Sequence, residues 1–332
     1  MVTRTSLVAA CCALSSVLCG CQGTADTVAE SYGDYDPKHP PNMLPIEGGI
    51  VVTDPAMFRW QDTYWVFSTG PGISVHASND LVVFREETQV FAQTPAWIGE
   101  SLPQVTDLWS PDVVSWNGTV HLYYAASTFS SRRSCIGHAT TKSIDQPFVD
   151  QGPLICSNLT DLVDDYNTID PAVLWDAPDG PWMVFGSWDS GIKLIALDRD
   201  GNRRDTNIYS VAARSSDNPA IQAAYLYRWR EYYYLFVSFD GSPNHVLRVG
   251  RARQVRGPYH DRDGQDMLDG GGTVVLAGNT RFKGPGSNMV FDDGDQRLNL
   301  YHAYDAEQDG ASVLRIGQLF FDNDGWPVTA GP

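Results

Sequence analysis

Short apolar runs separated by polar turns recur along the chain from residue 54 onward. Each copy begins with a small or acidic residue, often beside a proline, and continues with a short apolar strand, a polar turn and an aromatic-rich strand. Asn117-Gly118 and Asp293-Gly294 are strong hairpin turns, and the Val, Tyr, Phe and Trp content of the flanks favours strands over helices. The pattern predicts hairpins that begin at Asp54, Ser110, Asp170, Gln222 and Ser287.

The spacing of the hairpins indicates the fold class. Successive copies begin 56, 60, 52 and 65 residues apart, which leaves room in each period for two further strands. The sequence offers no amphipathic helical stretch of useful length. Five repeats of four strands predict an all-β chain folded as a five-bladed β-propeller. The alternative, a β-sandwich with fortuitous spacing, is disfavoured because sandwiches rarely repeat so long a period.

A propeller brings the starts of its repeats together. The innermost strand of each blade lines the central channel, so the five starting residues should form a ring at one mouth of that channel. Asp112, two residues after Ser110, faces the same side of its strand and should add a carboxylate deeper in the channel. Acids gathered from distant parts of a sequence are costly unless they are solvated, paired or used, so this ring is a candidate functional site.

The N-terminus has the features of an export signal. Arg4 supplies a basic start, and residues 6–18 are apolar but too short for a comfortable membrane span. Residues 18–21, Leu-Cys-Gly-Cys, then resemble a bacterial lipobox. We expect residues 1–20 to be removed as a lipoprotein signal peptide and Cys21 to be lipidated. An ordinary secretory signal cut nearby is the alternative, and either form exports the protein.

The remaining sequence divides into a tether and one folded domain. Residues 21–45 carry Gly, Asp, Ser, Thr and a cluster of prolines with little apolar periodicity, as expected of a flexible tether. Residues 46–332 hold the repeats and form the predicted propeller. Four of the six cysteines belong to the signal and lipobox, which leaves Cys135 and Cys156 in the domain. They either form a disulfide in an oxidising compartment or remain two partly buried thiols.

Composition and charge narrow the function. The 332 residues include 23 Lys and Arg against 40 Asp and Glu, for a formal net charge of −17. Nucleic-acid affinity comes largely from Lys and Arg that displace counterions, so nucleic acid is a poor candidate partner for this chain. With 42% hydrophobic and 19% charged residues, the chain can bury a large core, and general disorder is excluded.

Several segments of the repeats match one enzyme family in order. They are Asp54-Pro55, Ser68-Thr69-Gly70-Pro71-Gly72-Ile73, Trp109-Ser110-Pro111-Asp112, Asn167-Thr168-Ile169-Asp170-Pro171, Gly186-Ser187-Trp188, Tyr232 to Asp240, and Tyr301-His302-Ala303-Tyr304-Asp305. On these segments the chain resembles the arabinanases of glycoside hydrolase family 43. Members of that family are five-bladed propellers that cut α-1,5-linked arabinan with inversion.

The resemblance implies roles for acidic residues of the ring. In that family the blade-one Asp is the general base, the blade-three Asp tunes and orients the acid, and a blade-four Glu is the general acid. By position, Asp54 would deprotonate water and Asp170 would be the modulator. An inverting site needs two carboxyl groups about 6.5–9.5 Å apart, which leaves room for the attacking water.

The general-acid position departs from the family pattern. Where arabinanases have Glu-Ala-Pro, this chain has Gln222-Ala223-Ala224. An amide has no titratable proton, so Gln222 cannot act as the general acid, whose contribution is typically 10²–10⁴-fold in rate. Asp112, Asp217 and Asp240 are candidates to replace it by their proximity in the repeat.

The blade-five position departs as well. Arabinanases read Gly-Pro-Gly-His there and present the His toward a metal in the channel, whereas this chain reads Gly284-Pro285-Gly286-Ser287. A hydrated Ca²⁺ or Na⁺ prefers oxygen ligands, and Asp112 lies close by, but the imidazole ligand is missing. We therefore assign no certain cofactor and leave a Ca²⁺ or Na⁺ ion in the central channel open, with Asp112 and Ser287 near the place where it would lie.

Other residues of the matching segments are candidates to contact a sugar. Aromatic side chains can stack on sugar rings, although an aromatic in a propeller more often packs between blades. Small polar side chains can hydrogen-bond sugar hydroxyls, with ordinary turn capping as the alternative. Ser130 stands where arabinanases carry a substrate-contacting Gly. The candidate substrate-binding residues are Trp109, Phe129, Ser130, Asn167, Gly186, Ser187 and Trp188.

Two functions of different classes remain open. The first is an exported, inverting arabinan hydrolase with Asp54 as base, Asp170 as modulator and an unusual or missing acid. The second is a lipid-anchored protein of the bacterial cell envelope that holds arabinan or a related pectic polysaccharide without cutting it. Asp54 and Asp170 favour the enzyme, whereas Gln222 and Ser287 favour the binder. A protein-docking propeller is disfavoured because the matching segments cluster at the cleft. We expect a monomer that touches the membrane only through its N-terminal lipid.

Overall fold

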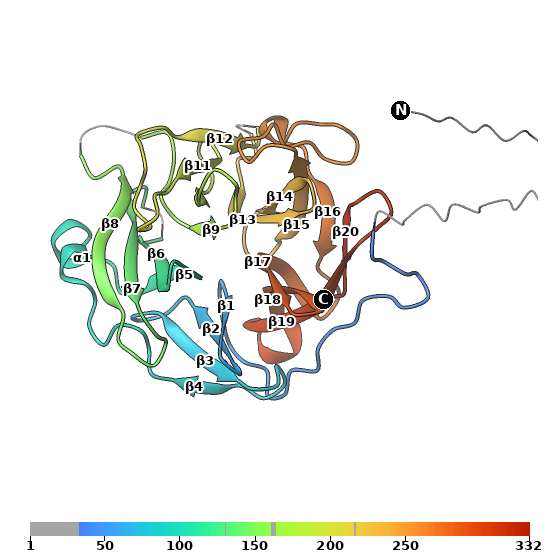
Figure 1. Cartoon of the computed structure of the whole chain (residues 1–332), viewed down its shortest axis with the longest axis horizontal. Helices are drawn as coiled ribbons and strands as arrows, with labels where there is room; N and C mark the ends of the chain where they lie inside the picture. The colour runs from blue at the N-terminus through green and yellow to red at the C-terminus, as the bar shows by residue number, and fades with distance from the viewer. Residues whose placement is uncertain (1–32, 130, 161–163, 216) are drawn as a thin grey trace, which may run out of the picture. The chain divides into compact units, whose positions relative to one another are not determined.

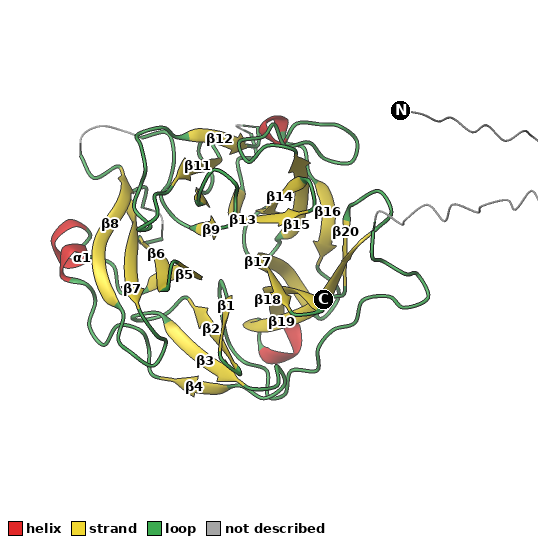
Figure 2. Cartoon of the chain, in the orientation of Figure 1, coloured by secondary structure: helices red, strands yellow, loops and turns green. Residues whose placement is uncertain are grey.

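Aromatic and β-branched runs pair into five antiparallel sheets of four strands each, arranged around a central channel axis (Figure 1). The computed structural model describes residues 33–129, 131–160, 164–215 and 217–332. Each sheet uses four strands that are consecutive in the chain, and almost all regular structure is strand (Figure 2). The predicted five-bladed β-propeller is therefore confirmed.

Within every blade the first strand lies nearest the channel and the fourth lies outermost (Figure 1). Blade one contains β1 (Ala56–Trp60), β2 (Thr63–Ser68), β3 (Ser74–Ser78) and β4 (Arg85–Glu87). Blade two contains β5 (Leu108–Trp116), β6 (Thr119–Ala126), β7 (Ser134–Thr141) and β8 (Val149–Ser157). Blade three contains β9 (Ala172–Leu174), β10 (Trp182–Phe185), β11 (Ile192–Ala196) and β12 (Tyr209–Ala212).

The last two blades repeat this order, and short helical turns lie in the connections. Blade four contains β13 (Ile221–Trp229), β14 (Tyr232–Phe239), β15 (Val246–Ala252) and β16 (Thr273–Ala277). Blade five contains β17 (Phe282–Asp293), β18 (Gln296–Asp305), β19 (Ala311–Phe321) and β20 (Pro327–Thr329). The helical turns are α1 (Ala96–Ser101), η1 (Met267–Asp269) and η2 (Ala306–Gln308).

The inner strands share one backbone kink at the channel mouth. Asp54, Ser110, Asp170, Ala223 and Ser287 have φ angles of 52°, 45°, 56°, 50° and 51°. A positive φ is uncommon outside glycine and costs on the order of 1–3 kcal/mol, so its recurrence marks equivalent positions. Two residues later, each inner strand pairs with the second strand of its blade. The pairs are Ala56–Phe67, Asp112–Tyr123, Ala172–Val184, Tyr225–Phe236 and Met289–Leu300.

This register corrects the predicted ring in blade four. The ring member is Ala223, and Gln222 precedes it by one residue. In the first three blades a proline follows the ring residue and marks its place, whereas Ala224 and Asn288 follow it in the last two. The absence of a proline in blade four left the position ambiguous by one residue.

The N-terminal part of the described chain is attached to blade five. The backbone amides of Leu44 and Val52 donate to carbonyls of β19, and Asp34 forms an ion pair with Arg297 at 3.0 Å. Residues 33–45, which the sequence pattern assigned to the tether, thus pack on the propeller and belong to the same compact unit. In the described ranges, no helix is long and apolar enough to cross a membrane.

The core consists of apolar layers between neighbouring blades. Trp116 and Tyr123 of blade two, for example, are buried together with Met183 and Phe185 of blade three. Burying such large side chains removes much apolar surface from water, and this stabilises the fold by about 25 cal/mol per Å². The blades are therefore held rigidly enough to fix the ring at the mouth.

Candidate active site

Two carboxyl groups meet at the channel mouth. Asp54 Oδ1 accepts a hydrogen bond from Ser287 Oγ at 2.6 Å, and Asp54 Oδ2 accepts one from Thr69 Oγ1 at 2.9 Å. Thr69 Oγ1 in turn accepts from the backbone N–H of Ser110 at 3.0 Å. The hydroxyl of Ser110 then donates to Asp170 Oδ1 at 2.7 Å. A continuous path of hydrogen bonds therefore connects Asp54 on blade one with Asp170 on blade three.

Asp170 is the more buried of the two acids. Its residue is 8% exposed, and its Oδ2 accepts from the backbone N–H of Ala223 at 3.0 Å. Burial raises the pKa of Asp170, the negative charge of Asp54 adds to the rise, and the hydrogen bonds from Ser110 and Ala223 oppose it. Asp170 thus keeps its proton to a higher pH than an ordinary aspartate does.

A buried imidazole, His302, holds the backbone at Asp54. His302 Nδ1 accepts the backbone N–H of Asp54 at 3.1 Å, so this ring nitrogen carries no proton. Burial lowers the pKa of His302. Burial and the charge of His302 lower the pKa of the neighbouring His245 to about 4. Both rings are therefore neutral near pH 7, and His302 positions the Asp54 backbone without supplying a positive charge.

A small cavity lies at the centre of the ring. Its volume is about 40 Å³, which suits about one water molecule and no sugar ring. Asp112 lines it, is 3% exposed and accepts the backbone N–H of Val173 at 2.7 Å through Oδ2. Burial raises the pKa of Asp112 to about 7. A sugar must therefore lie above the ring, at the open mouth, while Asp112 stays below it.

The side chains described at this place form no cluster of metal ligands. Ser287 uses its hydroxyl to donate to Asp54, and one oxygen of Asp112 is engaged by Val173. Across residues 33–332, outside the few positions not described, no group of three or more His, Cys, Asp or Glu side chains could hold a metal. We therefore assign no step of the chemistry to a channel ion.

Gln222 lies on the rim beside an exposed aromatic side chain. Trp188 Nε1 donates to Gln222 Oε1 at 3.1 Å, and the backbone N–H of Trp188 donates to Ile221 O at 2.8 Å. Trp188 is 43% exposed, so its ring stands at the surface of the mouth. These contacts place Gln222 and Trp188 together, one residue outside the ring.

The carboxyl groups considered as substitute acids are poorly suited to that role. Asp240 forms an ion pair with Arg214 at 2.7 Å. Burial acts to raise the pKa of Asp240, but the hydrogen bond and charge of Arg214 outweigh it, so the pKa lies below its usual value. Asp217 lies on an exposed turn before β13. Asp112 holds a proton to a higher pH but lies below the ring.

Aromatic candidates on blade two lie close together. The rings of Trp109 and Phe129 have centroids 4.9 Å apart with a tilt of 43°, and Phe129 is 91% exposed. Trp109 directly precedes ring residue Ser110. Such exposed aromatic faces can stack on sugar rings. Ser130, the neighbouring candidate, lies outside the described residues.

The predicted polar contacts turn inward. Asn167 Nδ2 donates to Ser187 Oγ at 3.1 Å, and Asn167 Oδ1 accepts from Ser134 Oγ at 2.5 Å. Ser187 is only 1% exposed. Gly186 has a φ of 116°, and a Cβ there would lie 2.8 Å from Gly191 O. These residues brace the loop that carries Asp170.

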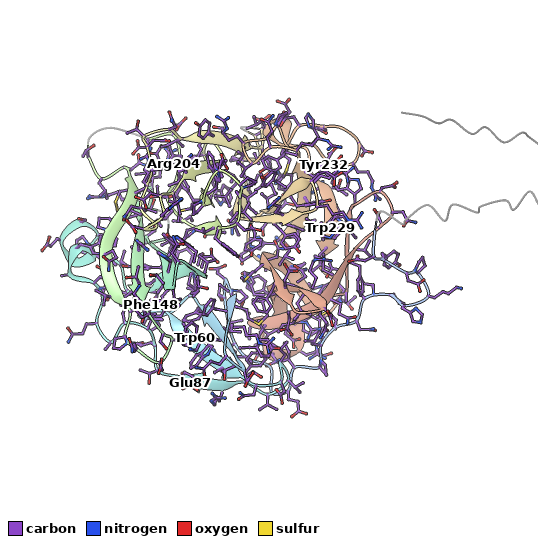
Figure 3. The ribbon with its side chains drawn as sticks, viewed as in Figure 1. Trp60, Glu87, Phe148, Arg204, Trp229 and Tyr232 are labelled. Carbon is purple, nitrogen blue, oxygen red and sulfur yellow. A yellow bond between two sulfur atoms is a disulfide. The ribbon has the colours of Figure 1, made fainter. Side chains whose placement is uncertain are left out.

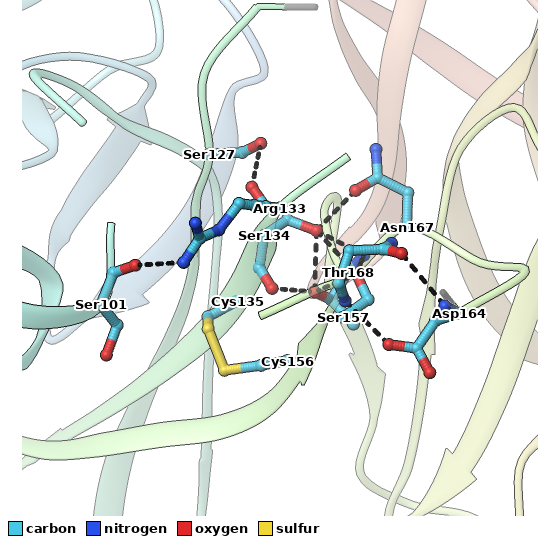
Figure 4. The surroundings of a disulfide bond; sticks show 11 residues. Ser101, Ser127, Arg133, Ser134, Cys135, Cys156, Ser157, Asp164, Asn167 and Thr168 are labelled. Atoms are coloured by element: carbon cyan, nitrogen blue, oxygen red, sulfur yellow. Dashed lines mark hydrogen bonds between the residues drawn. A yellow bond between two sulfur atoms is a disulfide. The ribbon is translucent and has the colours of Figure 1, made fainter. Parts of the chain in front are cut away.

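A disulfide lies beside this bracing network (Figure 4). Cys135 and Cys156 face each other on β7 and β8 and form the bond that the sequence left open. Ser134 and Ser157, the residues next to them, both hydrogen-bond Thr168, two residues before Asp170 (Figure 4). Blade two therefore fixes the segment that precedes Asp170.

Sequence reasoning missed several contacts at the mouth. Thr69 joins Asp54 to blade two, and its only signal was its place in the matching segment at residues 68–73. Arg132 forms an ion pair with Asp189 that joins a loop of blade two to a loop of blade three. Nothing in the local sequence marks these two side chains as partners.

Comparison with known proteins agrees with this geometry. Residues 48–327 match the family described as glycosyl hydrolases family 43. The extracellular exo-α-(1→5)-L-arabinofuranosidase of Cellvibrio japonicus is 36% identical over 84% of this chain and 86% of its own length. The extracellular endo-α-(1→5)-L-arabinanase 1 of Bacillus subtilis is 34% identical over 82% of this chain and 86% of its own. The solved structure of a Cellvibrio cellulosa α-L-arabinanase with arabinohexaose superimposes with a TM-score of 0.79, at 35% identity over 85% of this chain and 96% of that one.

Proposed function

Because the chain belongs to family 43 of the glycosyl hydrolases, we propose that it is an arabinan-directed glycoside hydrolase. One observation carries the proposal: Asp54 and Asp170 lie at one channel mouth, joined by hydrogen bonds through Thr69 and Ser110. The similar proteins named for α-1,5-arabinan cleavage support the choice of arabinan as substrate.

Asp54 is the base in the proposed reaction. Its carboxylate takes a proton from a water molecule as that water attacks the anomeric carbon, opposite the departing sugar, so the configuration inverts. Ser287 and Thr69 each donate to one oxygen of Asp54 and thereby fix the direction of the carboxylate. Asp170 acts on the leaving side through its charge and its hydrogen bonds.

The leaving side of the reaction lacks an ordinary proton donor. Gln222 stands at the general-acid position, and its amide can donate a hydrogen bond to the glycosidic oxygen but cannot transfer a proton. The sugar then departs as an alkoxide that takes its proton from solvent, and its negative charge is less stabilised in the transition state. We expect turnover on unactivated arabinan to be lower by about 10²–10⁴-fold than with a carboxylic acid at this place.

A binding protein is the second candidate, and the surroundings of Gln222 favour it. The Trp188 indole donates to the Gln222 amide oxygen, so the amide is held in a defined orientation at the rim. Exposed Phe129 and Trp188 offer stacking faces that need no catalysis. A cleft of this kind can hold arabinan while cutting it slowly or not at all.

Incubation of the full-length protein with linear arabinan separates the two functions. Reducing ends and bound arabinan are measured for wild type and for Asp54→Asn. We expect slow release of reducing ends by wild type, none above background by Asp54→Asn, and equal binding by both. Binding without any cleavage by wild type identifies the binding protein, and absence of both contradicts the arabinan assignment.

We also propose that the protein is exported and held at a membrane through lipid on Cys21. The extracellular names of the similar proteins support export, while Cys21 lies outside the described residues. A lipid anchor should move the full-length protein into the detergent phase of a two-phase extraction. Cys21→Ser should stay in the aqueous phase, and equal partitioning of both proteins would remove the anchor from the account.

A further inference from the structure

An arginine-rich pocket lies on blade four, away from the channel mouth. Its volume is about 360 Å³, and its lining includes Tyr232, Arg251, Arg253, His260, Arg262 and Trp326. Only 23 Lys and Arg occur in this chain of net charge −17, and three of them line this one pocket. Asp261 also lines the pocket, and its oxygens accept backbone N–H groups. Three guanidinium groups against one carboxylate still make the pocket basic within an acidic molecule.

Aromatic rings hold the first guanidinium in place. Arg251 lies 4.5 Å from the Tyr232 ring centroid and 4.4 Å from that of Trp326. Its Nη1 donates to the carbonyl oxygens of Asp324 and Gly325 at 2.6 and 3.1 Å. Among the described residues, Arg251 contacts these rings and carbonyls and forms no ion pair, so no carboxylate neutralises its charge.

The second guanidinium is exposed beside the first. Arg253 lies 4.7 Å from the Tyr232 ring centroid, and its Nη2 donates to Tyr232 Oη at 3.0 Å. Arg253 forms a long ion pair with Glu231 at 4.0 Å through Nη1, and its side chain is 67% exposed, so water screens this pair. Arg262 differs because it forms an ion pair with Asp322. Arg251 and Arg253 therefore have N–H groups and positive charge available for a ligand.

The pocket is remote from the proposed active site. β13 starts at Ile221 beside the ring and ends at Trp229, and nine strand residues span about 25–30 Å. Tyr232 follows the turn at that far end, on the side where blades four and five meet (Figure 3). A ligand in this pocket leaves the mouth open.

We propose that this pocket binds the carboxylates of an acidic polysaccharide. Planar guanidinium groups pair with carboxylates through two parallel hydrogen bonds, and stacking on Tyr232 and Trp326 already orients them. The volume is at the lower end of the range for small-molecule sites and suits one or two sugar units. An acidic polymer is repelled by the rest of the molecule, so the basic pocket sets where the polymer binds.

The inference rests on the proposed function, because it assumes that the protein acts on plant-type polysaccharides. A pectic polymer carries neutral arabinose side chains on a backbone that contains uronic acids. If the uronic-acid backbone of the polymer bound at blade four, the effective concentration of its arabinose side chains at the channel mouth would rise. The pocket would thus hold the enzyme on its substrate without taking part in cleavage.

Affinity electrophoresis of the full-length protein tests the proposal with polygalacturonate as the probe. The first variant is the double substitution Arg251→Gln/Arg253→Gln. The second is the single substitution Arg253→Gln, which changes only an exposed side chain and does not endanger the fold. The control, Arg85→Gln/Arg204→Gln, removes two charges elsewhere, one of them also stacked on an aromatic ring. Melting temperatures check the fold, and a gel with neutral linear arabinan reports on the mouth separately.

We expect polygalacturonate to retard wild type and control equally and the double variant about 10-fold less, because charged hydrogen bonds are lost. Arg253→Gln should fall between them, and retardation by arabinan should stay unchanged. Equal retardation of all four proteins overturns the proposal. Displacement by inorganic phosphate as readily as by galacturonate oligomers, or binding to anionic lipid vesicles but not to polygalacturonate, also overturns it. If retardation by polygalacturonate depends on both arginines while arabinan is neither bound nor cut, only the proposed function fails.

Discussion

The ring at the channel mouth has two halves that share a backbone and differ in chemistry. Blades one and three carry Asp54 and Asp170, whereas blades four and five carry Ala223 and Ser287, with the same positive φ in all four. The kink therefore depends on strand pairing and packing rather than on any one side chain. The fold can keep the geometry of a site while its chemistry changes residue by residue.

The altered half of the ring, at Ala223 and Ser287, still donates hydrogen bonds to the carboxylates of the other half. Ser287 Oγ donates to Asp54, and the backbone N–H of Ala223 donates to Asp170. What the altered half lacks is a titratable acid near Gln222. The comparison predicts that a carboxyl group placed at position 222 restores arabinan hydrolysis, because the hydrogen bonds to Asp54 and Asp170 are already in place.

Gln222→Glu should have the largest effect. The two side chains have almost the same shape, so the variant restores a proton donor without disturbing the rim. We expect arabinan hydrolysis to rise by about 10²–10⁴-fold, measured as reducing ends from linear arabinan. Wild-type activity equal to that of the variant would show that another group already donates the proton. Gln222→Met, which has similar size and no proton, is the matched control and should stay at the wild-type rate or below it.

Asp170→Asn in the Gln222→Glu background should have the next largest effect. The substitution removes the negative charge that orients and tunes the acid but keeps groups able to bond Ser110 and Ala223. We expect kcat to fall by roughly 10²-fold and the alkaline limb of the bell-shaped pH profile, which reports the general acid, to move to lower pH, because a neighbouring negative charge is lost. A change in KM alone would mean that Asp170 only binds substrate.

Asp112→Asn tests stability rather than turnover. Burial raises the pKa of Asp112 from 3.8 to about 7, so between these values the unfolded chain releases a proton that the folded chain keeps. Stability is therefore lost as the pH rises from about 4 to 7, by an amount on the order of 4 kcal/mol for a shift of this size. Asn does not titrate, so urea unfolding should show the variant losing less stability than wild type between pH 5 and pH 8. Parallel curves for the two proteins would rule out a buried, proton-holding Asp112.

Ser287→Ala should have the smallest effect. It removes one of the donors to Asp54, while Thr69 remains to hold the other oxygen. One hydrogen bond contributes about 0.5–1.5 kcal/mol, so we expect kcat to fall about 2- to 10-fold in the Gln222→Glu background with KM nearly unchanged. Ser287→Cys, whose thiol is a weaker donor and whose Cβ is unbranched at this positive φ, should recover part of the rate. No recovery, or a loss of folding, would assign Ser287 a purely structural part.

The sequence allowed the propeller to be predicted because each hairpin is a local pattern of apolar strand and polar turn. The ring position of blade four could be predicted only from the resemblance, because no proline follows Ala223 in this chain. In the arabinanase pattern Glu-Ala-Pro the proline follows Ala, as Pro55 follows Asp54, so Ala223 was the equivalent of the ring residue. Contacts such as that between His302 and the Asp54 backbone could not be predicted, since they join residues 248 positions apart through the closure of the whole ring.

The most direct test of the central claim is the rate of reducing-end release from linear arabinan by Gln222→Glu, with and without Asp54→Asn in the same chain. The account predicts clear hydrolysis by the single variant and a return to background in the double variant, because the attacking water then has no base. The amount of arabinan bound is measured for both proteins, and equal amounts show that both are folded. Hydrolysis by the double variant at the rate of Gln222→Glu would contradict the account, because the chemistry would then not depend on the carboxylate at the channel mouth.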